Sequence, residues 1–449
     1  MRYRIAIRFL YLVWVCFLAS ELSAQKISGR IVGLESGSEF LVLRESRGSL
    51  SRSIDSVRFG SHGEFAFPER SYPLGFYELV LSDSDRVDLI LDPRERTVEL
   101  EFSGVPLQRH IRVLRSEENK RLWDYKLVSR ESQAVQASAF AERRSLLPDQ
   151  TRRMLELDSV TARAIALQKA HLLGIIEGYP KSYFAKVLSA DRAVEGARDQ
   201  EPMALLKEFD LSDPSLMRSS SYDKAVMTFL RNIHAVSEEQ FVSATDSLVL
   251  YAGRDPECRA YMLDHLIDLF STYGPEMPLR HLIDHYVTSP EDLRNIDPSL
   301  QAKVNELLKV SVGTIAPDVD LPGPDGPLPL REIIQKNRCT ALFFYSSTCE
   351  HCHQQMPAVK ESYVLFRPKG FEVIGIALDA DSIEFQKMIL EKGLPWRCYS
   401  EFNGWGSKVA KAFQVHATPA FVLLDDKMRI IAKPVDGVDL GNFLEARFN

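Results

Sequence analysis

The sequence of 449 residues predicts three folded parts: a small antiparallel β-sandwich, an all-α domain, and a C-terminal α/β domain in which helices flank a central mixed sheet. Three observations predict this order. Apolar residues alternate with period two near the N-terminus, recur at helical spacing through the middle, and fall in alternating strand-like and helix-like runs after residue 311. The chain is also too long for one ordinary core.

The N-terminus has the pattern of a signal peptide. Three arginines among the first eight residues precede an apolar run from Phe9 to Ala19, and Ala24 is a small residue before a plausible cleavage site. The run is shorter than the roughly 20 residues that span a bilayer. We therefore expect residues 1–24 to be removed and the mature protein to be exported to the periplasm, without a stable membrane span. Retention as an anchor is the alternative.

Residues 25–104 have the pattern of the β-sandwich. Short alternating runs, among them 77–81 and 98–102, are separated by Gly, Pro, Ser and Asp. The region offers no cluster of titratable residues, so we expect it to act as a docking or spacer module.

Residues 105–310 have helical periodicity, interrupted at Gly-Pro and Asp-Pro steps where helices should end. Within this region His281, Asp284 and His285 follow the order of an inverted zinc-protease motif, with Asp in place of Glu. Two histidines four residues apart share one face of a helix. No third ligand is evident, and ordinary helical histidines are far commoner, so we expect no metal site.

Composition narrows the class of partner and the roles of the cysteines. A net charge of −7 without a clustered basic face argues against nucleic acid as a partner.

Of the six cysteines, Cys16 would leave with the signal peptide. We expect Cys258, Cys339 and Cys398 to be buried as small apolar residues. This leaves one couple of cysteines for redox chemistry.

That couple lies in Cys349-Glu350-His351-Cys352, which follows the apolar run 341–345 and opens a helix-like stretch. A CxxC pair in this strand-to-helix setting is typical of a redox-active dithiol. The thiolate is the attacking species, and a helix N-terminus favours negative charge on Cys349. We therefore expect Cys349 to be the nucleophile and Cys352, nearly one turn later, to be the more buried resolving thiol.

The two residues between the cysteines should tune the redox potential in opposite directions. A protonated or hydrogen-bonding His351 would stabilise the Cys349 thiolate and make the disulfide more oxidising, whereas Glu350 would repel the thiolate. The exposure of Glu350 decides which effect is larger, and the sequence leaves this open. The dithiol carries two electrons itself, so we expect no external cofactor.

The segment from about Val312 to Asn449 resembles the exported thioredoxin-like disulfide reductases of the TlpA and ResA type. The residues that carry the resemblance are Gly313-Thr314-Ile315-Ala316-Pro317-Asp318-Val319, the pair Cys349 and Cys352, Pro357, and Ala417-Thr418-Pro419-Ala420-Phe421-Val422. The regions before it are similar to the β and helical extensions found on exported thioredoxin-like proteins of Bacteroidetes.

The resemblance implies a thioredoxin fold for residues 311–449. It also implies exchange of the Cys349/Cys352 disulfide with protein substrates, in the direction of reduction, with electrons from a membrane thiol donor. Thr418 and Pro419 would form the substrate-docking loop, and a cis bond before Pro419 would hold a backbone edge against the cysteines.

The sequence departs from the family at four positions. Thr348 replaces a tryptophan, Phe343 stands where thioredoxin has a buried aspartate, and Gln355 stands where the family often has glutamate. His351 replaces the proline that is common in reductases. The usual helpers of proton transfer are therefore missing from their expected places.

Three alternatives remain. The motif with His353 also satisfies the C-x-x-C-H pattern of haem attachment. A peroxiredoxin-like peroxidase would need a proline where Leu342 stands and an arginine instead of Pro419. A non-catalytic binding protein on a thioredoxin scaffold is the third, although both the CxxC and the Thr-Pro loop are intact.

Overall fold

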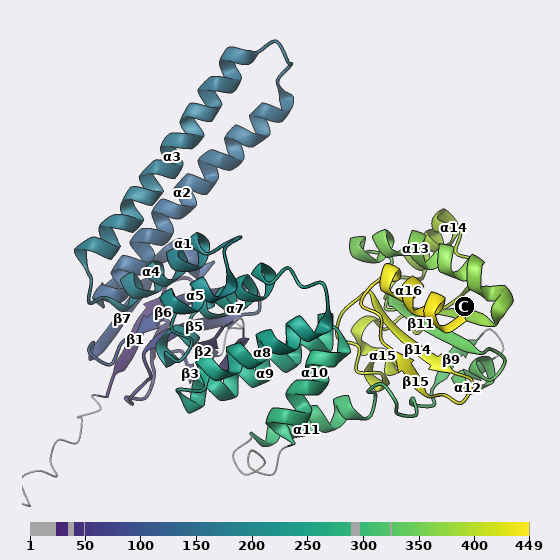
Figure 1. Ribbon diagram of the computed structural model, residues 1–449. Coiled ribbons are helices and arrows are strands. Elements are labelled where there is room, and N and C mark those ends of the chain that lie inside the picture. Colours follow the sequence, from purple (N-terminus) through teal and green to yellow (C-terminus); the bar gives the residue numbers. More distant parts are fainter. Residues whose placement is uncertain (1–23, 35–39, 49, 289–296, 324–325, 449) are drawn as a thin grey trace, which may run out of the picture. The chain divides into compact units, whose positions relative to one another are not determined.

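The computed structural model describes residues 24–34, 40–48, 50–288, 297–323 and 326–448 (Figure 1). The expected signal peptide, with Cys16, lies outside the described residues. The chain forms two compact units, Met1–Ile233 and His234–Asn449. Among the helices of the described residues, none is both long enough and apolar enough to cross a membrane.

The first unit contains two four-stranded sheets, in the orders β4-β1-β7-β8 and β3-β2-β5-β6. Their strands are β1 (Lys26–Ile31), β2 (Phe40–Arg47), β3 (Leu50–Arg58), β4 (Glu64–Ala66), β5 (Gly75–Ser82), β6 (Asp85–Leu91), β7 (Thr97–Phe102) and β8 (Ile111–Arg115). The β-rich N-terminal region is thus confirmed. One pairing differs from the antiparallel expectation, because β1 and β7 are parallel. The long chain between them supplies the crossover that parallel pairing requires.

The sheet region is longer than the sequence pattern predicts. After the short helix α1 (Leu107–His110), β8 returns to pair with β7. The boundary expected at residue 104 therefore falls inside this sheet. The run of β8 is short and mostly exposed, so its hydrophobic pattern is weak, and the pairing with β7 fixes it as a strand.

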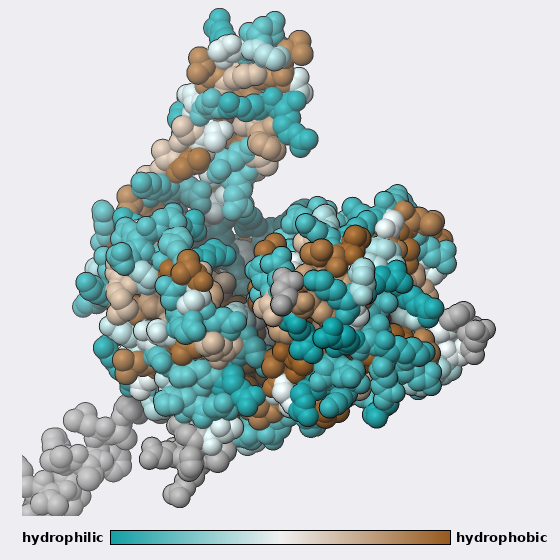
Figure 2. All heavy atoms as spheres, turned by 45° about the vertical axis from the view of Figure 1, so that its right-hand side comes forward, coloured by the Kyte–Doolittle hydropathy of each residue, from teal (hydrophilic) through white to brown (hydrophobic). Residues whose placement is uncertain are grey.

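The helices of the first unit begin with an antiparallel hairpin that extends away from the sheets of the same unit (Figure 1). The helices are α2 (Glu117–Ser145), α3 (Thr151–Gly178), α4 (Tyr183–Gly196), α5 (Pro202–Glu208), α6 (Pro214–Met217) and α7 (Ser220–Asn232). The buried Asn119 side chain bonds both the N–H and the carbonyl of Ile90, which fixes the base of the hairpin to β6. Exposed apolar side chains, including Phe140 and Leu155, interrupt its polar surface (Figure 2).

The remaining helices belong to the second unit. They are α8 (Glu238–Ala252), α9 (Pro256–Tyr273), α10 (Glu276–Leu282), a π-helical turn (Ile283–Val287) and α11 (Pro298–Leu308). After β8, the regular elements among the described residues up to 310 are thus all helices, but they are divided between two compact units at residue 233. Periodicity identifies helices and does not say which core each helix shares, so the sequence pattern could not show this division.

The C-terminal part of the second unit is an α/β domain with a five-stranded mixed sheet in the order β13-β12-β11-β14-β15. Its elements are β9 (Asp320–Gly323), β10 (Gly326–Pro329), α12 (Leu330–Ile334), β11 (Cys339–Tyr345), α13 (Glu350–Phe366), β12 (Phe371–Ala377), α14 (Ser382–Lys392), β13 (Arg397–Ser400), α15 (Lys408–Ala412), β14 (Ala420–Asp425), β15 (Ile430–Ala432) and α16 (Gly437–Phe448). Strands β11, β12 and β13 are parallel to one another. Strand β14 pairs antiparallel with β11, and β15 pairs antiparallel with β14. This confirms the predicted mixed sheet.

The central strand β11 is buried at every position, which explains its continuous apolar run. On one face, Phe343 and Tyr345 pack with residues of α13 and α16. On the other face, Leu342 and Phe344 pack with residues of α15. Because β11 is fixed from both sides, the loop that follows its carboxyl end starts from a rigid base.

Residues 234–449 are expected to fold without the first unit, because both faces of the central sheet and helices α8–α11 lie within them. The measurement is thermal unfolding of this fragment followed by circular dichroism, with the full chain as reference. A cooperative transition is the expected result. A fragment that aggregates or unfolds without cooperativity would show that its core depends on the first unit.

Candidate redox site

The structure places Cys349 at the N-cap of α13, with φ −87° and ψ 107°. Its sulfur accepts the backbone N–H of Cys352 at 3.3 Å. The position is the one that the sequence predicts, because the helix begins immediately after the first cysteine. An unpaired N–H and the helix dipole both favour negative charge on this partly exposed sulfur.

Cys352 is fully buried beneath its partner and packs in the core cluster with Phe343 and Tyr345. Burial, and then its contact with Cys349, raises the pKa of the Cys352 thiol to about 12. Cys352 therefore stays protonated at neutral pH and is shielded from solvent. The two thiols are chemically unequal, in the order that nucleophile and resolving thiol require.

The Thr418-Pro419 loop lies against the first cysteine. The bond between Thr418 and Pro419 is cis, and the Cys349 thiol donates a hydrogen bond to the Thr418 carbonyl oxygen at 3.5 Å. Strand β14 begins directly after the loop and pairs antiparallel with β11, with Ala420 opposite Phe344. The sheet register therefore brings together residues that are almost 70 positions apart in the sequence.

A groove of about 370 Å³ opens beside the dithiol within the second unit. Its lining includes the segment 417–422, His351, Gln355 and residues 270–274 at the end of α9. A disulfide that enters this groove would meet the loop and the first turn of α13 together.

Glu350 and His351 both have exposed side chains at the start of α13. Their charges are therefore screened by solvent and salt. Their predicted effects on the redox potential therefore act from the protein surface, and neither side chain is buried enough for its effect to outweigh the other.

The departures from the family pattern have structural explanations. Phe343 is fully buried and stacks on Phe421, with ring centroids 4.9 Å apart. The Gln355 side-chain oxygen accepts the N–H of Gly437 at 2.9 Å, which joins α13 to α16. Thr348 is exposed beside the cysteine. Two of these positions thus serve packing and helix docking rather than proton transfer.

The sequence analysis missed Asp379, a buried carboxylate after β12. Its Oδ1 atom accepts three hydrogen bonds, from the Ser346 hydroxyl and from the N–H and hydroxyl of Ser347, at 2.8 to 2.9 Å. The signal was present, since the carboxyl ends of neighbouring parallel strands meet at one edge of a sheet. Asp379 therefore holds the loop that leads from β11 to Cys349.

The other described cysteines are not in disulfides. Cys258 and Cys339 are fully buried, as predicted, and burial raises the pKa of Cys339 to about 12. Cys398 is only partly covered but packs against the same core, and burial raises its pKa to about 11. These thiols are poor nucleophiles beside Cys349.

The geometry of His353 argues against haem attachment. Its Nε2 atom lies 2.8 Å from the carbonyl oxygen of Ser347, so this nitrogen carries the proton and donates it. A nitrogen engaged in this way is not available to bind iron, and the buried Cys352 sulfur could not form a thioether to a macrocycle.

The histidine pair of the second unit is engaged by neighbouring side chains. His281 Nε2 lies 2.6 Å from Asp246 Oδ1, and the rings of His281 and His285 stack with centroids 5.3 Å apart. Within the described residues, no group of three or more His, Cys, Asp or Glu side chains could hold a metal ion.

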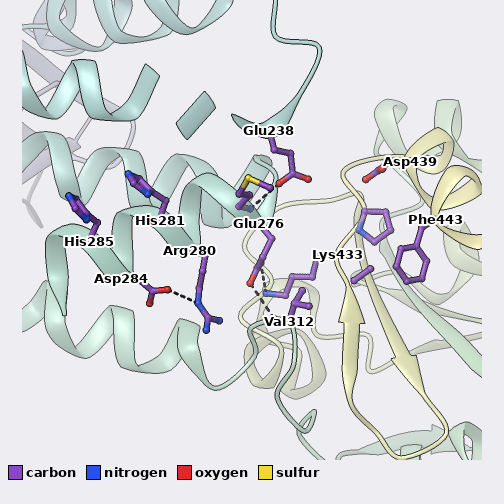
Figure 3. Close-up of a pocket in the computed structure, with 13 residues that line it drawn as sticks. Glu238, Glu276, Arg280, His281, Asp284, His285, Val312, Lys433, Asp439 and Phe443 are labelled. Atoms are coloured by element: carbon purple, nitrogen blue, oxygen red, sulfur yellow. Dashed lines mark hydrogen bonds and ion pairs between the residues drawn. The ribbon is translucent and has the colours of Figure 1, made fainter. Parts of the chain in front are cut away.

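A larger pocket, of about 660 Å³, lies next to these histidines (Figure 3). Glu276 points across it toward Lys433, with their charged atoms 3.7 Å apart, and also accepts the N–H of Val312 at 3.2 Å. Burial lowers the pKa of Lys433. These contacts tie α10 to the segments that flank the sheet.

Comparison with known proteins agrees with this site. Residues 312–433 match the AhpC/TSA family. The thiol-disulfide oxidoreductase ResA of Bacillus cereus is 23% identical over 126 residues, which cover 28% of this chain and 70% of that protein. The C-terminal part of the chain has a thioredoxin-like fold and is similar to proteins of the TlpA/ResA type. A chloroplastic peroxiredoxin Q of Gentiana triflora is 30% identical over 133 residues, which cover 29% of this chain and 58% of that protein.

Solved structures with a similar fold include two from Bacteroides. One is the thioredoxin domain of a thiol-disulfide oxidoreductase from Bacteroides vulgatus. It is 24% identical to this chain over the matched part, which covers 31% of this chain and 99% of that structure, with a TM-score of 0.29. The other is the C-terminal domain of a putative thiol-disulfide oxidoreductase from Bacteroides thetaiotaomicron. It is 27% identical, and the match covers 31% of this chain and 96% of that structure, with a TM-score of 0.29.

Brief treatment of the native, reduced protein with iodoacetamide at pH 7 should modify Cys349 and leave Cys352 unmodified. Burial raises the pKa of Cys352 to about 12, so at pH 7 it stays a shielded thiol, and its labelling should grow only as pH rises toward that value or in urea. Peptide mass spectrometry measures both sites. The variant Cys349→Ser is the control and should take up almost no label, whereas equal labelling of both cysteines would contradict the assignment.

Proposed function

We propose that this protein is an exported thiol-disulfide oxidoreductase that reduces disulfides of protein substrates through Cys349 and Cys352. The observation that carries the proposal is the inequality of the two thiols. One sulfur accepts a helix N-terminal N–H at a partly exposed position, and the other is fully buried one turn later.

The reaction proceeds by two exchanges of sulfur. The Cys349 thiolate attacks one sulfur of the substrate disulfide, forms a mixed disulfide and releases the other substrate sulfur as a thiolate. Cys352 then loses its proton and attacks the Cys349 sulfur, which releases the second substrate thiolate. The substrate gains two electrons, and the enzyme dithiol becomes the Cys349–Cys352 disulfide.

Thr418 and Pro419 are proposed as the substrate-docking loop. The Thr418 carbonyl already faces the Cys349 thiol, so a peptide chain aligned along this loop would present its disulfide to the nucleophile. The groove beside the dithiol would receive the flanking residues of the substrate.

Repeated turnover requires a donor of electrons, because each cycle leaves the enzyme oxidised. In an exported protein this donor would be a membrane thiol protein, and we propose the periplasm as the compartment. Residues 1–24 would be the signal peptide, and the β and helical regions before the thioredoxin-like domain would dock or space it. No metal or other cofactor enters this chemistry.

A peroxiredoxin-like peroxidase is the second candidate, and the 30% identity to a peroxiredoxin is the observation that favours it. Such an enzyme would reduce a peroxide at Cys349 and form a sulfenic acid. Against this candidate, Leu342 and Pro419 stand where that chemistry needs proline and arginine. Peroxide consumption that disappears in Cys349→Ser would establish the peroxidase and displace the reductase.

Reduction of insulin by dithiothreitol is the test of the reductase. The intact protein should accelerate precipitation of the insulin B chain, and Cys349→Ser should abolish the acceleration. The variant Cys352→Ala should stop after the first exchange and accumulate a mixed disulfide at Cys349, visible on non-reducing gels. If the protein shows no turnover and Cys352→Ala traps no mixed disulfide, the protein is a non-catalytic binding protein.

The variants Glu350→Gln and His351→Gln should shift the redox potential in opposite directions. Loss of the Glu350 charge makes the disulfide more oxidising, whereas loss of His351 makes it less oxidising at acidic pH, where imidazole is charged. Both side chains are exposed, so each shift should stay within about 20 mV and shrink in high salt. Equilibration with glutathione at two salt concentrations measures this, and shifts of the same sign would refute the opposing roles.

A further inference from the structure

The pocket beside α10 has no part in the exchange of sulfur proposed above. It has a volume of about 660 Å³ and lies within the second unit, bounded by Glu276, Met277 and Arg280 of α10 and by Pro434 and Phe443 of the thioredoxin-like domain. We call it the α10 pocket. Figure 3 shows α10 on one side of this space and Phe443 on the other. Its size is that of sites that bind small molecules or side chains.

The α10 pocket adjoins the groove beside the dithiol. Three residues line both cavities: Glu276, Lys433 and Pro434. The next residue, Val435, lines the groove and is 45% exposed, so the segment after β15 runs from one cavity to the other with an apolar edge. The groove also contains Thr418, whose carbonyl accepts the Cys349 thiol. A peptide in the groove with its disulfide at Cys349 would therefore have the α10 pocket beside it.

The charged side chains of the α10 pocket already have partners. Arg280 donates a hydrogen bond of 3.0 Å to Asp284. Glu238 and Asp439 each accept a backbone N–H, at 3.0 and 3.1 Å. The ion pair of α10 with Lys433 engages the remaining two charges. An ion that enters the pocket would have to compete with these partners and lose its own water. An uncharged group would leave every one of these contacts intact.

Apolar side chains supply much of the rest of the lining. Met277 is 42% exposed, and Phe443 of α16 is half-buried, with Val312 and Pro434 beside them in the pocket. A cavity of about 150 Å³ is enough for a benzene ring, so the α10 pocket has room for an aromatic side chain and its backbone. Methionine is flexible, and its sulfur makes favourable contacts with aromatic rings. The lining therefore fits an aromatic group best.

We propose that the α10 pocket is a specificity subsite that binds an aromatic side chain close to the disulfide of a protein substrate. The ring would pack against Met277 and Phe443 while the disulfide lies at Cys349 and the backbone between them follows the groove. Because α10 precedes the thioredoxin-like domain, the helices of the second unit would take a direct part in choosing the substrate. The inference rests on the proposed function and names the class of substrate that it uses.

The probes are synthetic peptides with one internal disulfide, in which each flanking position in turn holds Phe, Ala, Lys or Glu. Reduced full-length protein is mixed with each peptide, the reaction is quenched with acid, and chromatography measures the reduced peptide. The result is a second-order rate constant for every peptide. The ratio of the Phe to the Ala rate constant at one position is the readout, because a general change in activity cancels from it.

With Phe at one or more flanking positions, the rate constant should exceed that of the Ala peptide by roughly tenfold to a hundredfold. The reason is that a buried ring removes far more apolar surface from water than a methyl group does. Lys and Glu should give no such gain, since each would have to displace a partner that the pocket already holds.

The variant Met277→Gln keeps the length and the helix propensity of the side chain but replaces the thioether with an amide. It should lower the Phe/Ala ratio by about threefold to tenfold. Met203→Gln is the matched control and should keep the ratio of the parent. Met203 is also 42% exposed and is also the second residue of a seven-residue helix, but it is not in the lining of the α10 pocket.

Three results would overturn the inference. The first is a Phe/Ala ratio below about twofold at every position of peptides that are reduced. The second is the ratio of the parent in Met277→Gln, which would place the aromatic preference elsewhere. The third is a faster reaction with Lys or Glu than with Phe, which would make the pocket an ionic site. If Met277→Gln does not fold, Met277→Ala decides by the same ratio.

Failure of the proposed function gives a different pattern. Peptides with serine in place of both cysteines bind without redox chemistry, and isothermal titration calorimetry measures their affinity. If no disulfide is reduced but the Phe peptide binds more tightly than the Ala peptide, and Met277→Gln removes the difference, the reductase is refuted and the α10 pocket stands. Reduction of all peptides at one rate would leave the reductase and refute the pocket. Neither reduction nor selective binding would refute both.

Discussion

The hydrogen bond from the Cys352 N–H to the Cys349 sulfur is the contact on which the site depends. It exists because α13 begins one residue after Cys349, so the sulfur caps the helix instead of a Ser, Thr or Asp side chain. The start of α13 is fixed in turn by β11, whose two buried faces leave the strand no freedom to shift. The packing of β11 thereby determines which sulfur lies at the N-terminus of α13.

The same packing shields the second thiol, Cys352, from solvent until the mixed disulfide has formed. Cys352 faces the aromatic core, where Phe343, Phe421 and Tyr345 stack in one layer. Burial of the second sulfur keeps it protonated and shielded while the first sulfur meets substrate. The buried carboxylate of Asp379 fixes the loop that carries the first thiol, through three hydrogen bonds to Ser346 and Ser347.

The sequence predicted the parts of this site that local patterns encode. The CxxC after an apolar strand located Cys349 and Cys352, and the Thr-Pro step before the next strand located the loop that lies against Cys349. It did not single out Asp379, because the contact of Asp379 with Ser346 and Ser347 depends on the pairing of β12 with β11 and not on a local motif. For the same reason it missed β8 and the division of the helices at residue 233, which depend on tertiary pairing rather than on periodicity.

The central claim is that Cys349 and Cys352 form a reducing dithiol. The redox potential of this pair, measured by equilibration of the full-length protein with glutathione and quantified by mass spectrometry of the two cysteines, tests it most directly. A reducing dithiol should have a potential near that of thioredoxin, about −270 mV. A value near about −120 mV, at the strongly oxidising end of the scale, would contradict a reductase and assign the opposite direction of electron flow.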